Sequence, residues 1–390
     1  MIVFRLPSLG ADMDKGTLLE WRVGPGDPVK KGDVVAVVDT TKAAIDVECW
    51  HDGTVEALLV EPGSEIPVGT AMAVLREAGE TSGQLKAQVE ALRATPKPVA
   101  APAAAAAAPT VAAAGEPERH AVSPAARRRA AELHVALERL AGTGPGGAVT
   151  LADVEKAAAA PAPSRAEAMR ETIAAAMARS KREIPHYYLA DDVLLEAAMA
   201  WLAARNRERS VTERLLLAPL LLQAVARALQ RYPEFNGFWK DGRFTAVAEV
   251  QVGVAIALRG GGLVAPALRD VVRKDVDTVN RELLDLVART RAGTLRASEL
   301  SDPTITVTSL GDQGVRTVFP IIYPPQVAIV GFGRVTDRPW TVDGGVRPLP
   351  VTTASLGADH RVSDGHRGAL FLAAIGDHLQ RPGELAKGPP

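Results

Sequence analysis

The sequence is poor in cysteine and has no excess of either charge. Cys49 is the single cysteine among 390 residues, so the chain cannot form an internal disulfide, which fits a reducing cytoplasm. The 45 basic and 46 acidic side chains nearly cancel, and this balance gives no general attraction to nucleic acid or to a membrane surface. We therefore expect a cytoplasmic protein whose partners include neither nucleic acid nor a membrane.

Long hydrophobic runs are also missing. The longest apolar run, residues 215–229, contains Pro219, Gln223 and Arg227, and it is too short and too interrupted to span a bilayer. It indicates a buried helix instead. The first residues lead directly into a strand-like pattern with acidic residues soon after, so we expect no signal peptide.

The chain is long and apolar enough for more than one folded domain. Its 390 residues imply two or three domains, and a hydrophobic content of 47% is enough for a core. Ala, Pro and Thr make up nearly all of residues 94–117, and a shorter stretch of this kind covers 157–163. Because proline breaks the helix that alanine would favour, we expect semi-stiff, mobile linkers there. The resulting division is a domain at 1–78, a linker at 79–119, a small domain at 120–157, a linker at 158–165 and a large domain at 166–390.

Lys42 stands at the centre of a run that predicts two strands and a tight turn. β-Branched and apolar residues lead into and out of residues 38–47 (VDTTKAAIDV), while acidic and hydroxyl residues cluster at the middle. A lysine at such a turn can be an unmodified, solvated charge. A lysine held out on a rigid hairpin also suits a modification site, where an enzyme attaches a swinging prosthetic arm.

Lys42 also lies between two copies of an internal repeat. Residues 16–21 (GTLLEW) resemble residues 53–58 (GTVEAL), and each copy is followed by a similar Gly/Pro turn, at 24–29 and at 61–66. Repeated short strands and turns predict a small two-fold β-barrel or sandwich.

Residues 1–78 thereby resemble a lipoyl domain, and the resemblance implies lipoate covalently attached to Lys42. The related biotin carriers usually flank their lysine with methionines, whereas Thr41 and Ala43 stand here, so lipoate is favoured over biotin. Thr41 replaces the aspartate that is common in lipoyl domains. This departure concerns recognition by partner enzymes rather than attachment of the arm.

The small domain at 120–157 carries the signals of two short helices. The serine–proline pair at 123–124 is typical of a helix N-cap with a proline in the first turn. A glycine-rich loop at 142–147 precedes a second helix, capped by Thr150 with Asp153 at its third position. The loop follows no strand and lacks the Lys-Ser/Thr ending of a P-loop, so phosphate binding is not expected. Apolar residues recur at helical spacing at Ala130, Leu133, Leu137 and Leu140.

This small domain resembles the peripheral-subunit-binding domain of 2-oxo acid dehydrogenase complexes. The basic residues with which that family grips partner subunits match Arg127 and Arg128. Ala131 and Ala148 stand where arginine is common, which leaves open which peripheral subunit binds. A small helical spacer is the alternative interpretation.

From Ser164 onward the chain mixes helical and strand-like patterns and predicts one large α/β domain. Helical periodicity covers residues 169–182, 194–209, 215–231, 276–292 and 366–378. Strand-like runs cover residues 250–258, 304–309, 326–332 and 347–358.

The run at 359–367 (DHRVSDGHR) follows a strand-like segment and precedes a helix. A histidine near the end of a strand can act as a general base near neutral pH, and His360 has that position. Asp364 lies within reach of the same turn. A His-x-x-x-Asp spacing alone is more typical of a salt-bridged turn, and a metal site would need more ligands than the chain offers nearby.

The full pattern DHRVSDG, followed by an apolar helix, resembles the signature of dihydrolipoamide acyltransferases, which share a fold with chloramphenicol acetyltransferase. Residues 169–186, 253–255, 262–266 and 304–311 resemble further segments of that family. All three domains then match in family order over nearly the whole chain. The resemblance implies a multidomain fold: an all-β lipoyl barrel or sandwich, a small α-helical peripheral-subunit-binding domain and an α/β chloramphenicol-acetyltransferase-like catalytic domain.

The resemblance also implies a mechanism. His360 takes the proton from the thiol of coenzyme A, the substrate, and the thiolate attacks the thioester carbonyl of acyl-dihydrolipoamide. A hydroxyl stabilises the resulting oxyanion, which is worth about 3–4 kcal/mol in the transition state. Thr308 matches the family position, usually serine, and the adjacent Ser309 is the fallback. Asp364 is implied to be an ion-paired residue that orients the site, with Arg179 as a candidate partner.

The implied partners follow from the same family. Its active site lies in a channel between the subunits of a homotrimer, and trimers assemble into cubes or dodecahedra. An arm on Lys42 collects an acyl group at the 2-oxo acid decarboxylase component, delivers it to His360 and is reoxidised at dihydrolipoamide dehydrogenase. The linkers keep that delivery intramolecular, at a high effective concentration.

The acyl group is expected to be acetyl, derived from pyruvate or acetoin. Branched-chain acyl and succinyl groups are the alternatives, because these transferases share their catalytic motifs and differ in pocket lining. A non-catalytic lipoylated scaffold is the alternative from another class. Such a protein would be expected to lose the histidine, and His360 is present.

Overall fold

The computed structural model describes residues 1–7, 15–40, 44–77, 89, 122–133, 137, 140, 142–159, 165–258, 262–311 and 314–388. The chain divides into two compact units, one made of residues 1–98 with 168–390 and the other of residues 99–167. Lys42 lies outside the described residues with its neighbours Thr41 and Ala43, as does the predicted linker at 79–119 apart from Val89.

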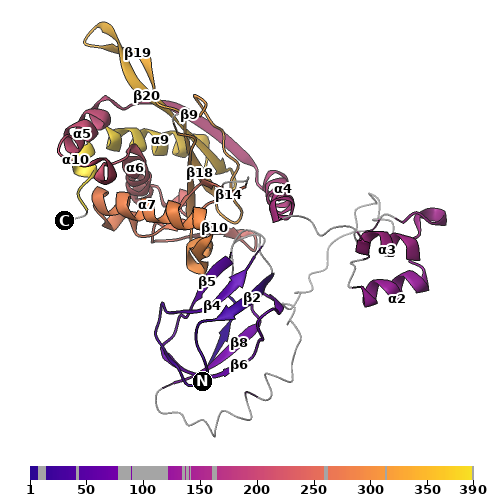
Figure 1. Cartoon of the computed structure of the whole chain (residues 1–390). Helices are drawn as coiled ribbons and strands as arrows, with labels where there is room; N and C mark the ends of the chain where they lie inside the picture. The colour runs from indigo at the N-terminus through magenta and orange to yellow at the C-terminus, as the bar shows by residue number, and fades with distance from the viewer. Residues whose placement is uncertain are drawn as a thin grey trace. The chain divides into compact units, whose positions relative to one another are not determined.

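Two small sheets form the N-terminal part of the first unit (Figure 1), and they contain the predicted repeat. Strand β2 pairs with β4 and β7, and β6 pairs in the same way with β8 and β3, so each repeat lends its short strand to the other. The strands are β1 (Ile2–Arg5), β2 (Lys15–Trp21), β3 (Pro28–Val29), β4 (Val34–Asp39), β5 (Ala44–Glu48), β6 (Gly53–Leu58), β7 (Glu65–Pro67) and β8 (Ala71–Arg76).

The two repeats turn at equivalent glycines. Gly26 and Gly63 have φ angles of 97° and 89°, a left-handed conformation that glycine adopts without steric cost. Between the sheets lies one apolar core that includes Leu18, Ile45 and Met72, all fully buried. The predicted two-fold β-barrel or sandwich is confirmed.

The second unit contains helices α2 (Pro124–Glu132) and α3 (Leu151–Ala159). Ser123 caps α2, because its Oγ accepts a hydrogen bond from the N–H of Ala126 at 3.1 Å. Asp153 accepts hydrogen bonds from Thr143 and from Thr150, and those from Thr143 contribute most to lowering the pKa of this carboxyl. Helix α2 ends at Glu132, so Leu133, the next apolar residue of the helical pattern, is the C-cap residue and is exposed.

The large α/β part of the first unit is built on a seven-stranded sheet. Its order is β15 (Ala267–Leu268), β12 (Val252–Val254), β17 (Ile305–Ser309), β18 (Ala328–Phe332), β20 (Gly345–Asp359) and β19 (Thr336–Val342), with β9 (His186–Leu194) also paired to β20. Strands β12, β17 and β18 run parallel to one another, and β20 is antiparallel to β18, β19 and β9. Short pairs of β10 (Gly237–Lys240) with β11 (Arg243–Ala246), and of β13 (Ile256–Ala257) with β14 (Leu263–Val264), complete the part.

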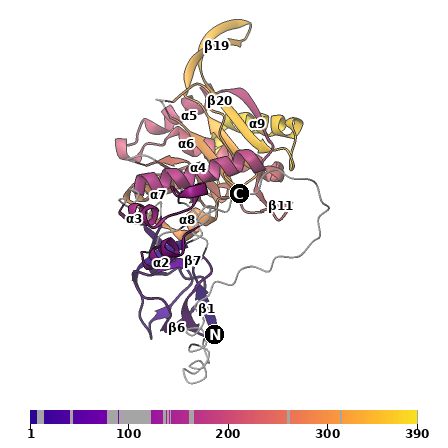
Figure 2. The same cartoon turned by 90° about the vertical axis from the view of Figure 1, so that its right-hand side faces the viewer.

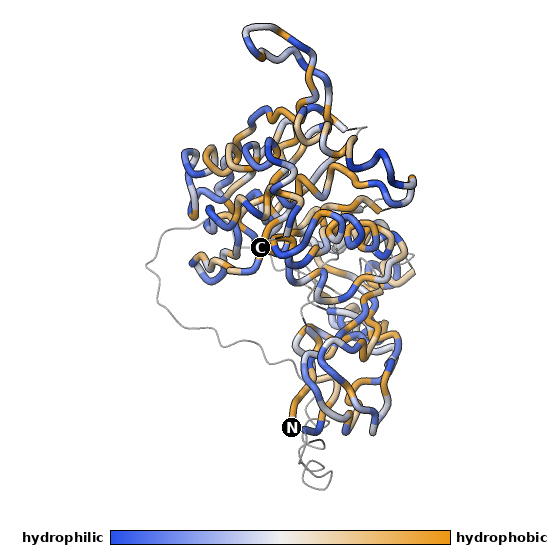
Figure 3. The backbone as a smooth tube through the Cα atoms, turned by 90° about the vertical axis from the view of Figure 1, so that its left-hand side faces the viewer, coloured by the Kyte–Doolittle hydropathy of each residue, from blue (hydrophilic) through white to orange (hydrophobic). Residues whose placement is uncertain are grey.

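Helices cover this sheet, and their bounds agree closely with the periodicity of the sequence. They are α4 (Arg165–Glu183), α5 (Glu196–Asn206), α6 (Leu217–Arg231), α7 (Val276–Ala292), α8 (Ala297–Ser301), α9 (Gly365–Leu379) and α10 (Pro382–Leu385), with short 3-10 turns η3 (Val211–Glu213), η4 (Pro233–Phe235) and η5 (Val271–Arg273). Figure 2 shows α4 as one long helix. Along the helices the tube of Figure 3 alternates between hydrophobic and hydrophilic colours.

The apolar run at 215–229 forms most of α6, and nearly all of that helix is buried, as predicted. Among the described residues, no helix combines the length and apolar character needed to cross a membrane. A two-residue turn, Asp343–Gly344, joins β19 to β20, and both of its residues have positive φ angles, as tight hairpins require. The hairpin projects beyond the sheet in Figure 1.

Candidate active site

The DHR motif lies where β20 ends, and its first and third residues fix the turn. Asp359 is completely buried, and its N–H donates to the carbonyl of Val327 at 2.9 Å. Arg361 binds the Asp359 carboxylate with two nitrogens, Nε to Oδ1 at 2.9 Å and Nη2 to Oδ2 at 2.6 Å. The guanidinium also lies 4.3 Å from the ring centre of Trp239. The buried carboxylate is thus fully paired, and it orients the backbone that carries His360.

His360 is held by its backbone and by one face of its ring. Its N–H donates to the carbonyl of Pro185 at 3.0 Å, and Tyr187 meets the imidazole edge-on, with ring centres 5.2 Å apart. The Tyr187 hydroxyl lies 2.8 Å from Ser363 Oγ, within the same motif, and burial raises the pKa of Tyr187. Because His360 itself is exposed, the imidazole is supported on one side and open to a substrate on another.

Asp364 caps helix α9. Its Oδ1 accepts a hydrogen bond from the N–H of Arg367 at 2.9 Å, and this bond lowers the pKa of the carboxyl. The structure does not pair Asp364 with Arg179, because Arg179 Nε donates to Glu183 at 3.0 Å on its own helix. Asp364 therefore anchors the first turn of α9 directly after the histidine turn.

Arg367 holds α9 in place through a second set of contacts, which could not be predicted from the sequence. Arg367 Nε donates to Glu234 at 2.6 Å, and its guanidinium lies 4.9 Å from the ring centre of Tyr232. Like Tyr187 and Trp239, these residues come from distant parts of the chain. No spacing rule connects them to the motif, so sequence reasoning had no signal for them.

Thr308, the predicted oxyanion residue, lies near the end of β17 and is half-buried. Its neighbour Ser309 is exposed and accepts a weak hydrogen bond from the N–H of Gly311 at 3.4 Å. Neither residue lies near His360. Thr308 is opposite Gly331 on β18, and Gly331 is opposite Ser355 on β20.

His360 follows Ser355 by five positions along β20, so the histidine and the threonine lie at opposite ends of the same sheet. Strand rise and spacing put them about 15–20 Å apart. A single chain does not bring the two predicted catalytic residues together.

The hairpin around Lys42 fits a covalently attached arm. Asp39 and Ala44 are register partners in the antiparallel pair β4–β5, so the four residues between them, including Lys42, connect two firmly paired strands. A lysine in this connection would hold lipoate through an amide at Nζ. In the second unit, Arg127 and Arg128 are exposed on α2, where a partner can reach them.

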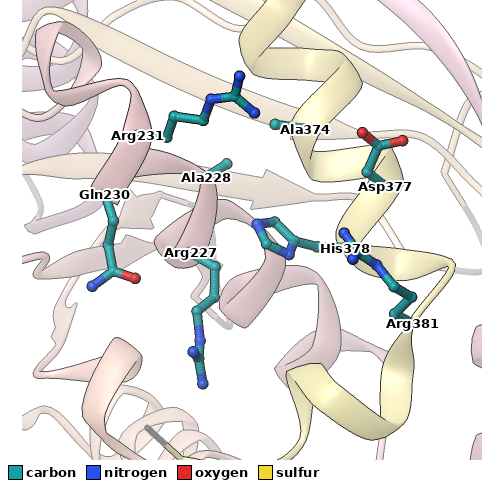
Figure 4. Close-up of a pocket in the computed structure, with 8 residues that line it drawn as sticks. All are labelled: Arg227, Ala228, Gln230, Arg231, Ala374, Asp377, His378 and Arg381. Carbon is teal, nitrogen blue, oxygen red and sulfur yellow. The ribbon is translucent and has the colours of Figure 1, made fainter.

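The described residues also line a basic cavity away from the histidine (Figure 4). It has a volume of about 470 Å³ between α6 and α9, with Arg227, Arg231, His378 and Arg381 around it. Burial lowers the pKa of His378. Since His378 lies at the C-terminal end of α9 and Asp364 at its N-terminus, roughly 20 Å of helix separates this cavity from the candidate site.

A strand-end histidine, a hydroxyl at the far end of the same sheet and a lysine in the connection between β4 and β5 are features expected of a multidomain group-transfer enzyme. Three family models match the chain: "Biotin-requiring enzyme" at residues 2–75, "e3 binding domain" at 121–155 and "2-oxoacid dehydrogenases acyltransferase (catalytic domain)" at 161–386. The chain belongs to the 2-oxoacid dehydrogenase acyltransferase family. The predicted fold class and enzyme class are confirmed, and covalently attached lipoate and coenzyme A are the cofactor and acyl acceptor that go with them.

Similar proteins support the same assignment over the full length. The chain is 30% identical to the dihydrolipoyllysine-residue acetyltransferase component of the pyruvate dehydrogenase complex from Zymomonas mobilis, covering 98% of each chain. It is 32% identical to the corresponding Rhizobium meliloti protein, over 97% of this chain and 98% of that one. It is also 30% identical to the acetyltransferase component of the acetoin cleaving system of Bacillus subtilis, over 97% and 98%.

Solved structures agree for the large domain. A probable dihydrolipoamide acetyltransferase from Listeria monocytogenes matches 57% of this chain and 94% of its own, with 27% identity and a TM-score of 0.52. The Azotobacter vinelandii dihydrolipoamide acetyltransferase matches 56% and 90%, with 27% identity and a TM-score of 0.53. That structure belongs to a study of a serine, a histidine and an asparagine in the catalytic mechanism.

Proposed function

We propose that this acyltransferase moves an acetyl group from the dihydrolipoyl arm on Lys42 to coenzyme A, within a 2-oxoacid dehydrogenase complex. The observation that carries the proposal is the exposed His360 imidazole, held by Tyr187 and by the buried Asp359–Arg361 pair at the end of β20. The acetyl group is supported by the names of the full-length relatives, which are acetyltransferases of pyruvate dehydrogenase complexes and of an acetoin cleaving system.

The residues of this chain have distinct tasks in that reaction. Lipoate, when attached, would supply a cyclic disulfide, and its reduced dihydrolipoyl form would carry the acyl group as a thioester on one sulfur. His360 accepts the proton of the coenzyme A thiol, and the resulting thiolate attacks the thioester carbonyl. The Thr308 hydroxyl donates a hydrogen bond to the oxyanion that develops on that carbonyl. His360 then returns its proton to the departing dihydrolipoyl sulfur.

The Azotobacter vinelandii protein supports the choice of residues. Thr308 and Asp364 stand at the same sequence intervals from His360 as the serine and the asparagine named in its title stand from the named histidine. Threonine keeps the hydroxyl of serine, and aspartate keeps the side-chain oxygen with which asparagine can cap a helix. The equal spacing favours Thr308 over Ser309.

A homotrimer would complete the site. Because His360 and Thr308 lie at opposite ends of one sheet, a catalytic pair needs the histidine of one copy beside the threonine of another. A closed ring of identical copies gives every copy both roles. A further solved relative, 28% identical and with a TM-score of 0.53, is described as the cubic core of a pyruvate dehydrogenase complex, which supports assembly beyond one trimer.

Mixing two inactive variants tests the shared site. Full-length His360→Ala and Thr308→Ala chains would be co-expressed with different tags and assayed for acetyl transfer. Random mixing in a trimer regenerates about one quarter of the wild-type sites, because every mixed ring contains one intact pair. Activity that stays at the level of the separate variants would overturn the shared site. If the wild-type protein shows no transfer of acetyl groups to coenzyme A, the proposed function itself is wrong.

The partners and the location complete the proposal. The e3 binding domain, with Arg127 and Arg128 exposed, would bind dihydrolipoamide dehydrogenase, and the 2-oxo acid decarboxylase component would acylate the arm. A cytoplasmic location would supply the reducing conditions that suit the free thiol of Cys49. The mass of the intact native protein distinguishes lipoyl-Lys42 from a biotinyl or an unmodified lysine. Assays with acetyl-, isobutyryl- and succinyl-CoA against dihydrolipoamide identify the acyl group.

A further inference from the structure

One short strand of the acyltransferase domain belongs to a sheet of the lipoyl domain. Strand β16 (Thr294–Arg296) follows α7 and pairs in parallel with β5, so that Thr294 is opposite Ala44 and Arg296 is opposite Asp46. The sheet then runs in the order β16-β5-β4-β2-β7. The main chain of β5, an edge strand of the lipoyl domain, is thus hydrogen-bonded to the main chain of β16 in the catalytic domain.

Side chains reinforce the ladder at its C-terminal end. Glu48, the last residue of β5, is only 5% exposed, and its carboxylate accepts a hydrogen bond from Ser298 Oγ. Arg296 Nη1 lies 3.5 Å from the other carboxylate oxygen. A buried carboxylate without such partners is costly, so the two residues of the catalytic domain match Glu48 specifically.

Apolar contacts complete the interface. Ala297, the first residue of α8, is 2% exposed and belongs to the core cluster of the lipoyl domain, and Leu300 packs against the same cluster. The interface therefore has three elements: a main-chain ladder, a buried polar pair and an apolar contact. It is also short, with three register pairs, which suits a contact that must open when the arm visits other enzymes.

The contact lies at the histidine end of the large sheet. Helix α8 leads into the N-terminal end of β17, and β17 runs parallel to β18. The N-terminal end of β18 meets the last residue of β20, because Asp359 N–H donates to Val327, and His360 comes next. On the lipoyl side, β5 begins two positions after Lys42. The strand that docks is therefore the strand that leaves the modified hairpin.

We infer that β16 and α8 form the docking site through which the acyltransferase domain recognises the acylated lipoyl domain, by adding strand β5 to its own β16. The inference rests on the proposed acyl transfer. It adds the contact surface on each domain, which is β16 with α8 on the acyltransferase domain and β5 on the lipoyl domain. Docking raises the rate of acyl transfer from the lipoyl domain above the rate from free acyl-dihydrolipoamide, which lacks β5 and Glu48. The contact serves equally within one chain or between neighbouring chains of an assembly.

A disulfide tests the geometry. Register partners in a sheet have Cα separations within the range of a disulfide, so full-length protein with Ala44→Cys and Thr294→Cys should cross-link under mild oxidation. The matched control pairs Thr294→Cys with Glu65→Cys on β7, at the opposite edge of the same sheet. Cross-links within a chain or between chains both support docking. Equal cross-linking in test and control, or none in the test pair, overturns it.

A kinetic ratio tests the role. Ser298→Ala in the full-length protein should slow transfer from the lipoyl domain about tenfold relative to transfer from free acyl-dihydrolipoamide, since Glu48 loses its buried donor. The control is Ser301→Ala on the same short helix, which should leave the ratio unchanged. An unchanged ratio for Ser298→Ala overturns the docking site. A loss of transfer from both donors in the wild-type protein would count against the proposed function instead.

Discussion

The two ends of strand β18 carry the two halves of the candidate active site, and they are built differently. At its N-terminal end, the buried Asp359 carboxylate accepts hydrogen bonds from two nitrogens of Arg361. Tyr187 contacts the His360 ring, and Asp364 caps α9. At its C-terminal end, Thr308 is half-buried, and Ser309 beside it is exposed. The histidine half is organised by contacts within one chain, whereas the half that contains Thr308 has few such contacts and ends in an exposed residue.

The open end is also apolar. Leu310, Val315 and Phe319 are exposed, and the N–H of Arg334, just after β18, donates to the carbonyl of Val315 at 2.9 Å. Exposed apolar side chains next to the half-buried hydroxyl of Thr308, the candidate oxyanion residue, are what an interface with a second copy needs. The comparison teaches that folding of one chain organises the histidine half, while the hydroxyl half is left exposed, as the proposed assembly requires.

Removing the histidine should have the largest effect. His360→Ala is expected to lower kcat for acetyl transfer by about 10²–10⁴, because the coenzyme A thiol loses its general base. Transfer between acetyl-CoA and dihydrolipoamide measures this. The matched control is His366→Ala, an exposed histidine in the first turn of α9, which should remain close to wild type. A near-normal kcat for the His360→Ala protein would show that His360 is not the general base.

Removing the hydroxyl should come next. Thr308→Ala is expected to lower kcat by about 10²–10³, the usual cost of one oxyanion donor, while Thr308→Ser should stay near wild type. Ser309→Ala is the control, measured in the same assay. If Ser309→Ala is the damaging variant and Thr308→Ala is not, the oxyanion hydroxyl belongs to the neighbouring residue.

Breaking the buried pair should test how far the histidine half depends on its own support. Asp359→Asn removes the charge that Arg361 binds with two nitrogens, and since Arg361 is partly exposed the cost is expected to be about 2 kcal/mol of unfolding free energy. Urea denaturation measures this, with Asp337→Asn on the exposed side of β19 as the control. Equal stability of the two variants would show that the pair does not hold the turn.

Periodic and local features were predictable from the sequence. The helix expected at 276–292 is α7 with the same bounds, and the Ser123 cap is present as expected. The strand expected at 250–258 divides instead into β12 and β13. Between them Ala255 N–H donates to Val307, while Val254 N–H donates to Pro266, so neighbouring residues bond to different parts of the fold. Which distant segment each backbone N–H binds cannot be predicted from the local sequence pattern.

The same reason limits what the sequence could tell about the site. The motif predicts His360 and Asp364 as site residues, because their spacing along the chain is local. The contact of Tyr187 with Ser363 joins residues 176 positions apart. The separation of His360 from Thr308 follows from the register of three strands, which depends on how whole strands pair.

Acid should weaken the histidine half slightly through the cap of α9. The hydrogen bond from Arg367 lowers the pKa of Asp364 in the folded protein, so the stability it provides is present above the unfolded pKa of about 3.9 and is lost as pH falls through the lower folded value. Asp364→Asn keeps a capping oxygen but cannot titrate. We expect it to match the wild type in urea midpoint at neutral pH and to lose less stability below about pH 4.

Asp364→Ala provides the contrast, because it removes the cap at every pH. Its urea midpoint should be lower than that of the wild type at neutral pH, with the same flatter acid response as the asparagine variant. Three identical acid profiles would mean that the carboxylate is not the titrating group. Because Asp364 follows His360 by four positions, kcat measured over the same pH range shows whether this cap also holds the imidazole in position. A kcat that follows the cap would tie the order of the histidine half to the first turn of α9, whereas the Thr308 end of the sheet should respond only to assembly.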